Sequence, residues 1–169
     1  MIFLPQLDQM DCGPTCLAMV SNHYGKYINP KKLREQTFLT REGVSLSSIN
    51  FAADIIGFDT LASKLTTEKL IDLTFGKNPQ VPLPCILHWN QTHFVVLRKI
   101  SKNIFNKSYL FHIADPGHGF ISLNKEKFEH SWISDENQGV TLFLEPTKRF
   151  FELPSDKLEK TSWKFLLNY

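Results

Sequence analysis

Cysteine is scarce in this chain of 169 residues, which has three: Cys12, Cys16 and Cys85. An odd number of thiols does not make a disulfide framework, and the chain starts without the basic and then apolar segments of a secretory leader. We therefore expect free thiols and a reducing compartment.

Long apolar runs are also missing. The longest are short segments such as Phe94-Val95-Val96-Leu97, whereas a helix that crosses a bilayer needs about 20 apolar residues. The net charge is +2, and Lys and Arg are scattered along the chain. This balance argues against nucleic acid or an anionic surface as the main partner.

The sequence lacks the motifs of nucleotide and metal sites. Gly76-Lys77 is preceded by Ile71 where a P-loop has glycine, and Asn78 follows where it has Ser or Thr. The pair Cys12 and Cys16 has no second thiol pair at zinc-finger spacing. We expect no metal and no cofactor.

With 42% hydrophobic and 21% charged residues, the chain is typical of one compact domain that buries a sizeable core. Apolar spacing and capping signals favour helices in the first sixty residues, and alternating patterns favour strands after Pro84. We predict helices at 15–24, from 29 onward and at 45–56, and strands at 85–89, 93–97, 109–114, 120–123 and 140–144. Helices followed by antiparallel strands indicate an α+β fold.

Cys12 stands just before the first predicted helix. Unpaired N–H groups and the helix dipole favour the thiolate form of a cysteine at a helix N-terminus, and they can hold a developing oxyanion. Gln6 could supply a second oxyanion donor. The alternative is that Cys12 is a small buried hydrophobe, as many cysteines are.

A thiolate nucleophile needs an imidazole base and a third group that orients the imidazole. His93 opens a strand after a polar turn, and Asp115 closes the next strand. If these strands are antiparallel neighbours, the start of one lies beside the end of the other. The pattern therefore predicts that Asp115 lies next to His93.

The other histidines and cysteines have simpler interpretations. His88 and His112 lie inside predicted strands, where hydrogen bonds to the backbone are expected. The remaining histidines, at positions 23, 118 and 130, have surface-like neighbours, and Cys16 and Cys85 have apolar neighbours that indicate structural thiols.

Several motifs together resemble one family. They are Gln6 six residues before Cys12, the Asp-Cys-Gly at 11–13, His93-Phe94-Val95-Val96-Leu97 about eighty residues later, and Asp115-Pro116 on the following strand. Over about residues 1–150 the chain is similar to the N-terminal peptidase domain of bacteriocin-processing ABC transporters, the double-glycine leader peptidases.

This resemblance implies a papain-like cysteine peptidase, with helices packed against an antiparallel sheet. It gives Cys12 the role of nucleophile, His93 that of base and acid, Asp115 that of orienting group and Gln6 that of oxyanion donor. In the family, the domain lies on the cytoplasmic side of the bacterial plasma membrane. It cuts a precursor peptide after a Gly-Gly type pair, and transmembrane and ATP-binding domains export the product.

The resemblance also suggests a domain organisation and a partner. Residues 1–150 would be the peptidase domain, itself soluble, and residues 151–169 a linker toward a transmembrane domain absent from this sequence. The partner would be the leader of the precursor, bound as an amphipathic helix in an apolar groove. No nucleic acid is expected.

Two other functions stay open at this stage. The first is a catalytically inactive domain that only binds the export substrate, for which loss of the cysteine would be the expected signature. The second is another papain-like hydrolase, such as a cell-wall amidase or an acyltransferase, which would not require a Gly-Gly pair. The sequence does not identify the peptide cargo.

Overall fold

The computed structural model describes residues 1–37 and 44–156. Its helical elements are the 3-10 helix η1 (Gln9–Asp11) and the α-helices α1 (Cys12–His23), α2 (Pro30–Gln36), α3 (Leu46–Ile55), α4 (Thr67–Phe75), α5 (Lys125–Trp132) and α6 (Lys148–Glu152). Its strands are β1 (Phe58–Leu65), β2 (Cys85–Trp89), β3 (His93–Lys102), β4 (Tyr109–Asp115), β5 (Gly119–Asn124), β6 (Ile133–Asp135) and β7 (Gln138–Pro146). The predicted α+β class is confirmed.

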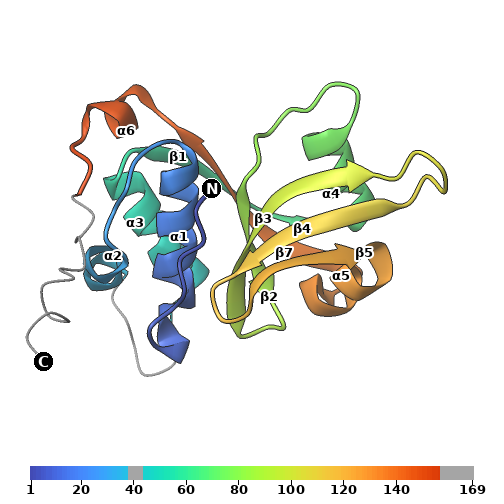
Figure 1. Ribbon diagram of the computed structural model, residues 1–169, viewed down its shortest axis with the longest axis horizontal. Helices are drawn as coiled ribbons and strands as arrows, with labels where there is room; N and C mark the ends of the chain where they lie inside the picture. Colours follow the sequence, from blue (N-terminus) through green and yellow to red (C-terminus); the bar gives the residue numbers. More distant parts are fainter. Residues whose placement is uncertain (38–43, 157–169) are drawn as a thin grey trace, which may run out of the picture.

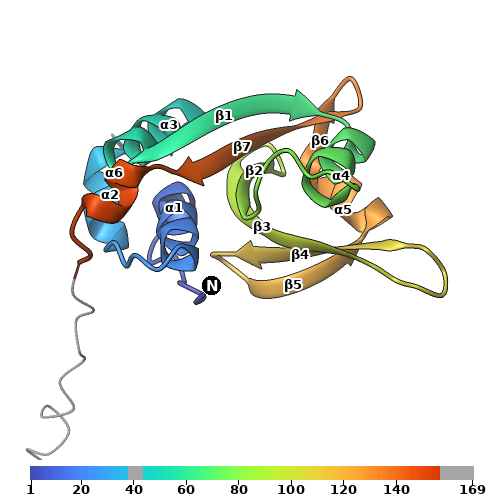
Figure 2. The ribbon, with the colours of Figure 1, turned by 90° about the horizontal axis from the view of Figure 1, so that it is seen from above.

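The elements gather in two halves (Figure 1). One half holds α1, α2, α3 and α6, and the other holds most of the sheet with α4 and α5. Strands β1 and β7 run from one half to the other, as Figure 2 shows from above. Because α1 lies where the two halves meet, its first residue lies beside the sheet.

Local signals explain the helices of the first half. The side chain of Asn29 accepts a hydrogen bond from the N–H of Lys31 at the start of α2, and Ser45 accepts one from Ser48 at the start of α3. After α3, Gly57 has a φ of +94°, and a Cβ there would lie 2.5 Å from the backbone nitrogen of Phe150. Only glycine fits that position.

The sheet is antiparallel, with strand order β1-β7-β2-β3-β4-β5 and β6 paired to β7. All five predicted strands are present. The structure adds β1 and β6 and the three short helices α4, α5 and α6, so helices are interspersed among the strands after residue 57. The expectation of mostly helices first and strands later was therefore too simple.

Both faces of the central strands β2 and β3 are buried, so successive side chains along them enter two different hydrophobic cores. Ile86 and Val96 point toward α1, whereas Leu87 and Val95 point toward a second core under α5. In that second core the rings of Phe111 and Phe128 stack with centroids 4.0 Å apart. Residues 12–21 of α1 are all buried, so the helix that carries Cys12 is fixed on several sides.

Candidate active site

His93 and Asp115 meet at one end of the sheet, as the sequence predicted. His93 is the first residue of β3 and Asp115 the last residue of β4, and these strands pair antiparallel with Val96 opposite Ala114. Nε2 of His93 lies 2.8 Å from Oδ1 of Asp115. The carboxylate is therefore placed to fix the orientation of the imidazole ring.

Three groups hold the carboxylate of Asp115. Besides His93, the backbone N–H of Gly117 donates to Oδ1 at 2.9 Å, and Nδ1 of His118 lies 2.9 Å from Oδ2. Burial raises the pKa of Asp115, but the hydrogen bonds from His93, Gly117 and His118 outweigh it and lower the pKa to about 2. Asp115 is thus ionised throughout the physiological pH range.

The contact with His118 was missed by the sequence analysis, which placed this histidine in a surface-like context. Its side chain is 78% exposed, and yet it forms the second imidazole partner of Asp115. A signal was present, because an aspartate and a histidine three residues apart across a Pro-Gly turn lie on the same side of that turn.

Cys12 is the first residue of α1 and is 5% exposed. Cys12 is one of the groups that determine the pKa of His93. Burial lowers the pKa of His93, but hydrogen bonds to Asp115 and Cys12, together with the negative charges of both, raise it to about 9. Because Nε2 faces Asp115, Nδ1 is the ring nitrogen left for the sulfur. A cysteine at a helix N-terminus beside an imidazole is the arrangement of a nucleophile with its base.

Gln6 lies beside the turn that follows Asp115. Its backbone N–H donates to the carbonyl of Pro116 at 3.0 Å. A Cβ built on Gly117 would lie 3.8 Å from Cδ and Nε2 of Gln6 and 3.5 Å from Oδ1 of Asp115. The amide of Gln6 therefore belongs to the same cluster, and its buried Oε1 accepts no hydrogen bond within residues 1–37 and 44–156.

Cys16 and Cys85 are fully buried, in agreement with their predicted structural role. Burial raises the pKa of both thiols, and for Cys16 the charges of Cys12 and Asp115 raise it further. Protonated buried thiols are poor nucleophiles. Among the three cysteines, Cys12 is the one whose side chain interacts with an imidazole.

His112 differs from its predicted hydrogen bonding. Its ring nitrogens lie 2.8 Å and 2.9 Å from the hydroxyls of Ser101 and Ser122, where backbone partners were expected. The neighbouring strands β3 and β5 place these hydroxyls on the same face as the ring. For His88, burial lowers the pKa, and the backbone of Gln91 opposes this shift.

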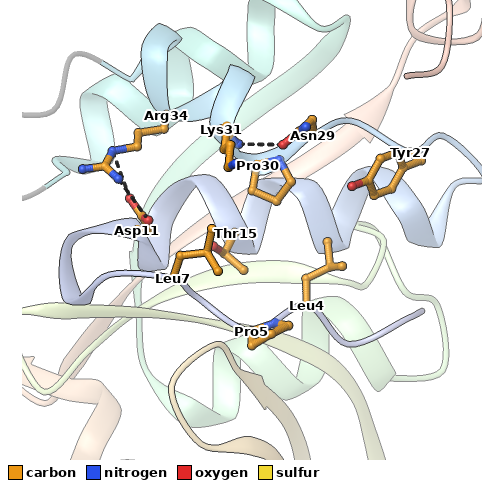
Figure 3. Close-up of a pocket in the computed structure, with 10 residues that line it drawn as sticks. All are labelled: Leu4, Pro5, Leu7, Asp11, Thr15, Tyr27, Asn29, Pro30, Lys31 and Arg34. Carbon is orange, nitrogen blue, oxygen red and sulfur yellow. Dashed lines mark hydrogen bonds and ion pairs between the residues drawn. The ribbon is translucent and has the colours of Figure 1, made fainter. Parts of the chain in front are cut away.

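Asp11, directly before Cys12, belongs to the Asp-Cys-Gly motif but was given no role of its own from the sequence. It is buried and pairs with Arg34 of α2, whose Nε lies 3.2 Å from Oδ1 and whose Nη1 lies 3.4 Å from Oδ2 (Figure 3). This ion pair ties the start of α1 to α2. It forms one wall of a cavity of about 630 Å³ between the N-terminal segment and α2, which none of the four candidate residues lines.

The described part of the chain offers neither a metal site nor a membrane-spanning helix. Residues 1–37 and 44–156 contain no group of three or more His, Cys, Asp or Glu side chains that could hold a metal ion. Within the same ranges, no helix has the length and the apolar character needed to cross a membrane.

Comparison with known proteins adds a family and a set of relatives. Residues 2–149 match the family model of the peptidase C39 family. The transport/processing ATP-binding protein ComA of Streptococcus pneumoniae is 34% identical over 151 residues, which cover 86% of this chain and 19% of that protein. The probable microcin-H47 secretion/processing ATP-binding protein MchF of Escherichia coli is 33% identical over 145 residues, covering 86% and 18%.

Solved structures show the same fold. A double glycine motif protease from an AMS/PCAT transporter, in complex with the leader peptide, matches with a TM-score of 0.72 and 27% identity over 86% of this chain and 91% of that one. The peptidase domain of Streptococcus ComA matches with a TM-score of 0.70 and 29% identity, over 85% and 97%. The chain thus spans nearly all of these peptidase domains but about a fifth of the curated relatives.

Proposed function

The chain belongs to the peptidase C39 family and is a cysteine peptidase, and on that premise we propose that it removes the leader of a secreted peptide precursor by cutting after a Gly-Gly type pair. One observation carries the assignment of roles. His93 is hydrogen bonded to Asp115 and interacts with Cys12 at the N-terminus of a helix, and its pKa is about 9. A charged imidazole beside a thiol is the arrangement that makes the thiol a nucleophile at neutral pH.

The first half of the reaction forms a thioester. The Cys12 thiolate attacks the carbonyl carbon of the second glycine, and the oxyanion is held by the Cys12 backbone N–H and by Nε2 of Gln6. His93 then donates its proton to the nitrogen of the leaving peptide as the C–N bond breaks. The processed peptide leaves, and the leader stays attached to Cys12.

The second half restores the enzyme. His93, now neutral, takes a proton from a water molecule, and the resulting hydroxide attacks the thioester carbonyl. The same two donors hold the second oxyanion. The C–S bond breaks, and Cys12 returns as a thiolate beside the imidazolium. The leader leaves as a carboxylic acid, which releases its proton to water. Asp115 keeps the ring in one orientation through both halves.

A Gly-Gly pair in the substrate requires a narrow slot in the enzyme. A slot that admits glycine but excludes larger side chains rejects other sequences by steric clash, which discriminates more strongly than apolar complementarity does. The partner of this slot would be the leader of the precursor. The name of the structural neighbour solved with a leader peptide supports this substrate class.

The names of the relatives suggest the setting of the domain. They are processing and transport ATP-binding proteins, of which this chain covers about a fifth. We place residues 1–150 as the peptidase domain on the cytoplasmic face of the bacterial plasma membrane. Residues 151–169 would then lead to transmembrane and ATP-binding parts. The first residues after the domain are held to it, since Asp156 bonds Asn29 and Lys32.

Cleavage of a precursor with a Gly-Gly leader tests the proposal. Wild type should release the leader, Cys12→Ala should give no product, and Cys85→Ala should retain activity because it changes a buried thiol away from the site. Circular dichroism controls for folding of each variant. Equal product from wild type and Cys12→Ala would end the peptidase assignment.

The same assay separates the two alternatives. If wild type binds the leader but releases no product, the domain only captures its substrate. If wild type cuts a precursor whose Gly-Gly pair is replaced by Val-Val as fast as the natural one, the enzyme is another papain-like hydrolase.

A further inference from the structure

The loop between β3 and β4, residues 103–108, projects from the body of the molecule in both views (Figures 1 and 2). Two adjacent apolar side chains stand on it, Ile104 at 88% and Phe105 at 98% exposure. They are the most exposed large hydrophobic side chains in the described part of the chain. Single exposed apolar residues are common on protein surfaces, but a neighbouring pair at the tip of a projecting hairpin indicates a contact surface.

Hydrogen bonds inside the loop hold these side chains outward. The N–H of Asn103 donates to the carbonyl of Ser108 at 2.8 Å, and the side chain of Asn103 accepts from the N–H of Phe105 at 2.9 Å. Asn106 in turn accepts from the N–H of Ser108 at 3.1 Å. Because these N–H groups are bonded within the loop, the tip can leave water at a lower cost than an open loop could.

The outer part of the hairpin itself, residues 98–110, carries charge of one sign. The sequence has no Asp or Glu between Asp72 and Asp115, whereas the hairpin carries four cationic side chains: Arg98, Lys99, Lys102 and Lys107. None of the four forms an ion pair within residues 1–37 and 44–156. Beside the hairpin, Lys125 forms ion pairs with Glu68 and Glu129, which largely neutralise these two carboxylates. Glu126 is the acidic residue that lines a hollow together with Lys107 and Ser108. The small overall charge of the chain conceals this local excess.

We propose that the tip of this hairpin docks on an anionic lipid bilayer, with Ile104 and Phe105 in the interfacial layer and Lys102 and Lys107 among the headgroups. Apolar side chains beside lysines are the combination that binds such interfaces. A protein partner fits less well, because a stable protein contact buries about 800 Å² per side, and a six-residue convex tip does not offer that area. This inference does not depend on the catalytic roles.

Vesicle sedimentation tests the proposal directly. The chain should bind vesicles of phosphatidylcholine with about one third phosphatidylserine, and bind vesicles of phosphatidylcholine alone much more weakly. The double variant Ile104→Ser/Phe105→Ser should lose binding. Lys102→Gln and Lys107→Gln should each weaken it about 5-fold, and added salt should weaken it further.

A matched control uses an apolar side chain far from the hairpin. Phe151→Ser changes a residue that is 60% exposed on α6, in the other half of the molecule, and it should bind as wild type does. Cleavage of a soluble precursor without vesicles should be the same for the tip variant and wild type. Equal binding to both kinds of vesicle, or undiminished binding of the tip variant, would overturn the proposal. So would loss of cleavage by a folded tip variant without vesicles, because the tip would then contact the peptide substrate.

Discussion

Replacing Asp115 by Asn removes a negative charge from between two imidazole rings and keeps the size of the side chain. The ordinary pKa of a histidine is 6.5, and in this site that of His93 is about 9, although burial lowers it. The difference corresponds to about 3 kcal/mol between the two protonation states of the ring. The hydrogen bond to Asp115 is the largest of the contributions that raise the pKa of His93. A hydrogen bond to Cys12 and the negative charges of Cys12 and Asp115 supply the remainder.

The Asp115→Asn variant should therefore hold the proton of His93 less tightly. If Asp115 supplies about half of the 3 kcal/mol, the protonated fraction on the alkaline side falls about tenfold. In wild type, kcat/KM should fall as the pH rises through about 9, because the leaving nitrogen then finds no proton. In the variant this fall should begin closer to neutral pH, and kcat/KM at about pH 10, above the pKa of wild-type His93, should be about tenfold below the wild-type value.

The assay is cleavage of a Gly-Gly peptide from about pH 5 to about pH 10, the interval in which such profiles are bell-shaped. Asp72→Asn is a matched control, since that carboxylate is exposed on α4 and should leave the profile unchanged. If kcat/KM of Asp115→Asn falls at the same alkaline pH as that of wild type, the pairing of His93 with Asp115 is not the cause of the raised pKa of His93.

The shifted pKa values of His93 and Asp115 also make the free energy of unfolding depend on pH. The pKa of His93 is higher in the folded chain than 6.5, so its contribution to the free energy of unfolding is complete below pH 6.5 and is lost as the pH rises through about 9. The pKa of Asp115 is lowered from 3.8 to about 2, so its contribution is present above pH 3.8 and is lost as the pH falls through about 2. Chemical denaturation across this range should show both losses in wild type and smaller ones in Asp115→Asn.

Three further substitutions test other parts of the site. Gln6→Ala removes an oxyanion donor and should lower kcat about 10²- to 10³-fold with little change in leader binding, measured by titration calorimetry; an unchanged kcat would exclude Gln6 from the oxyanion site. Gly13→Ala would place a Cβ 2.8 Å from Cδ1 of Ile49, and it should cost about 1 to 3 kcal/mol in urea denaturation; a variant as stable as wild type would contradict the tight packing. His118→Ala leaves Oδ2 of Asp115 without its imidazole partner and should lower kcat/KM by up to about 5-fold, with recovery in His118→Gln; a loss that glutamine does not restore would count against a role through this hydrogen bond.

Much of the candidate site could be predicted because its residues stand where elements begin and end. Cys12 precedes an apolar helical pattern, and His93 and Asp115 bound two alternating runs. Antiparallel neighbours joined by a short connection bring the start of one strand near the end of the other. The structure moves the start of the first helix from residue 15 to Cys12, which makes the cysteine a helical residue.

Other contacts depend on how elements pack, which periodicity does not encode. The pair of Asp11 and Arg34 exists because α2 lies across the start of α1. The helix α4 was missed although Thr66 caps it, because a short run of nine residues carries a weak periodic signal. Strand β1 lies at the edge of the sheet, and its mixed burial lacks the runs of buried residues that mark the central strands β2 and β3.

The central claim is that the sulfur of Cys12 attacks the precursor. Quenching the reaction in acid within the first turnover and measuring the mass of the protein tests it most directly. We expect a thioester between the leader and Cys12, which peptide mapping should locate to this residue. A leader released without any adduct at Cys12, together with full cleavage by Cys12→Ala, would contradict it.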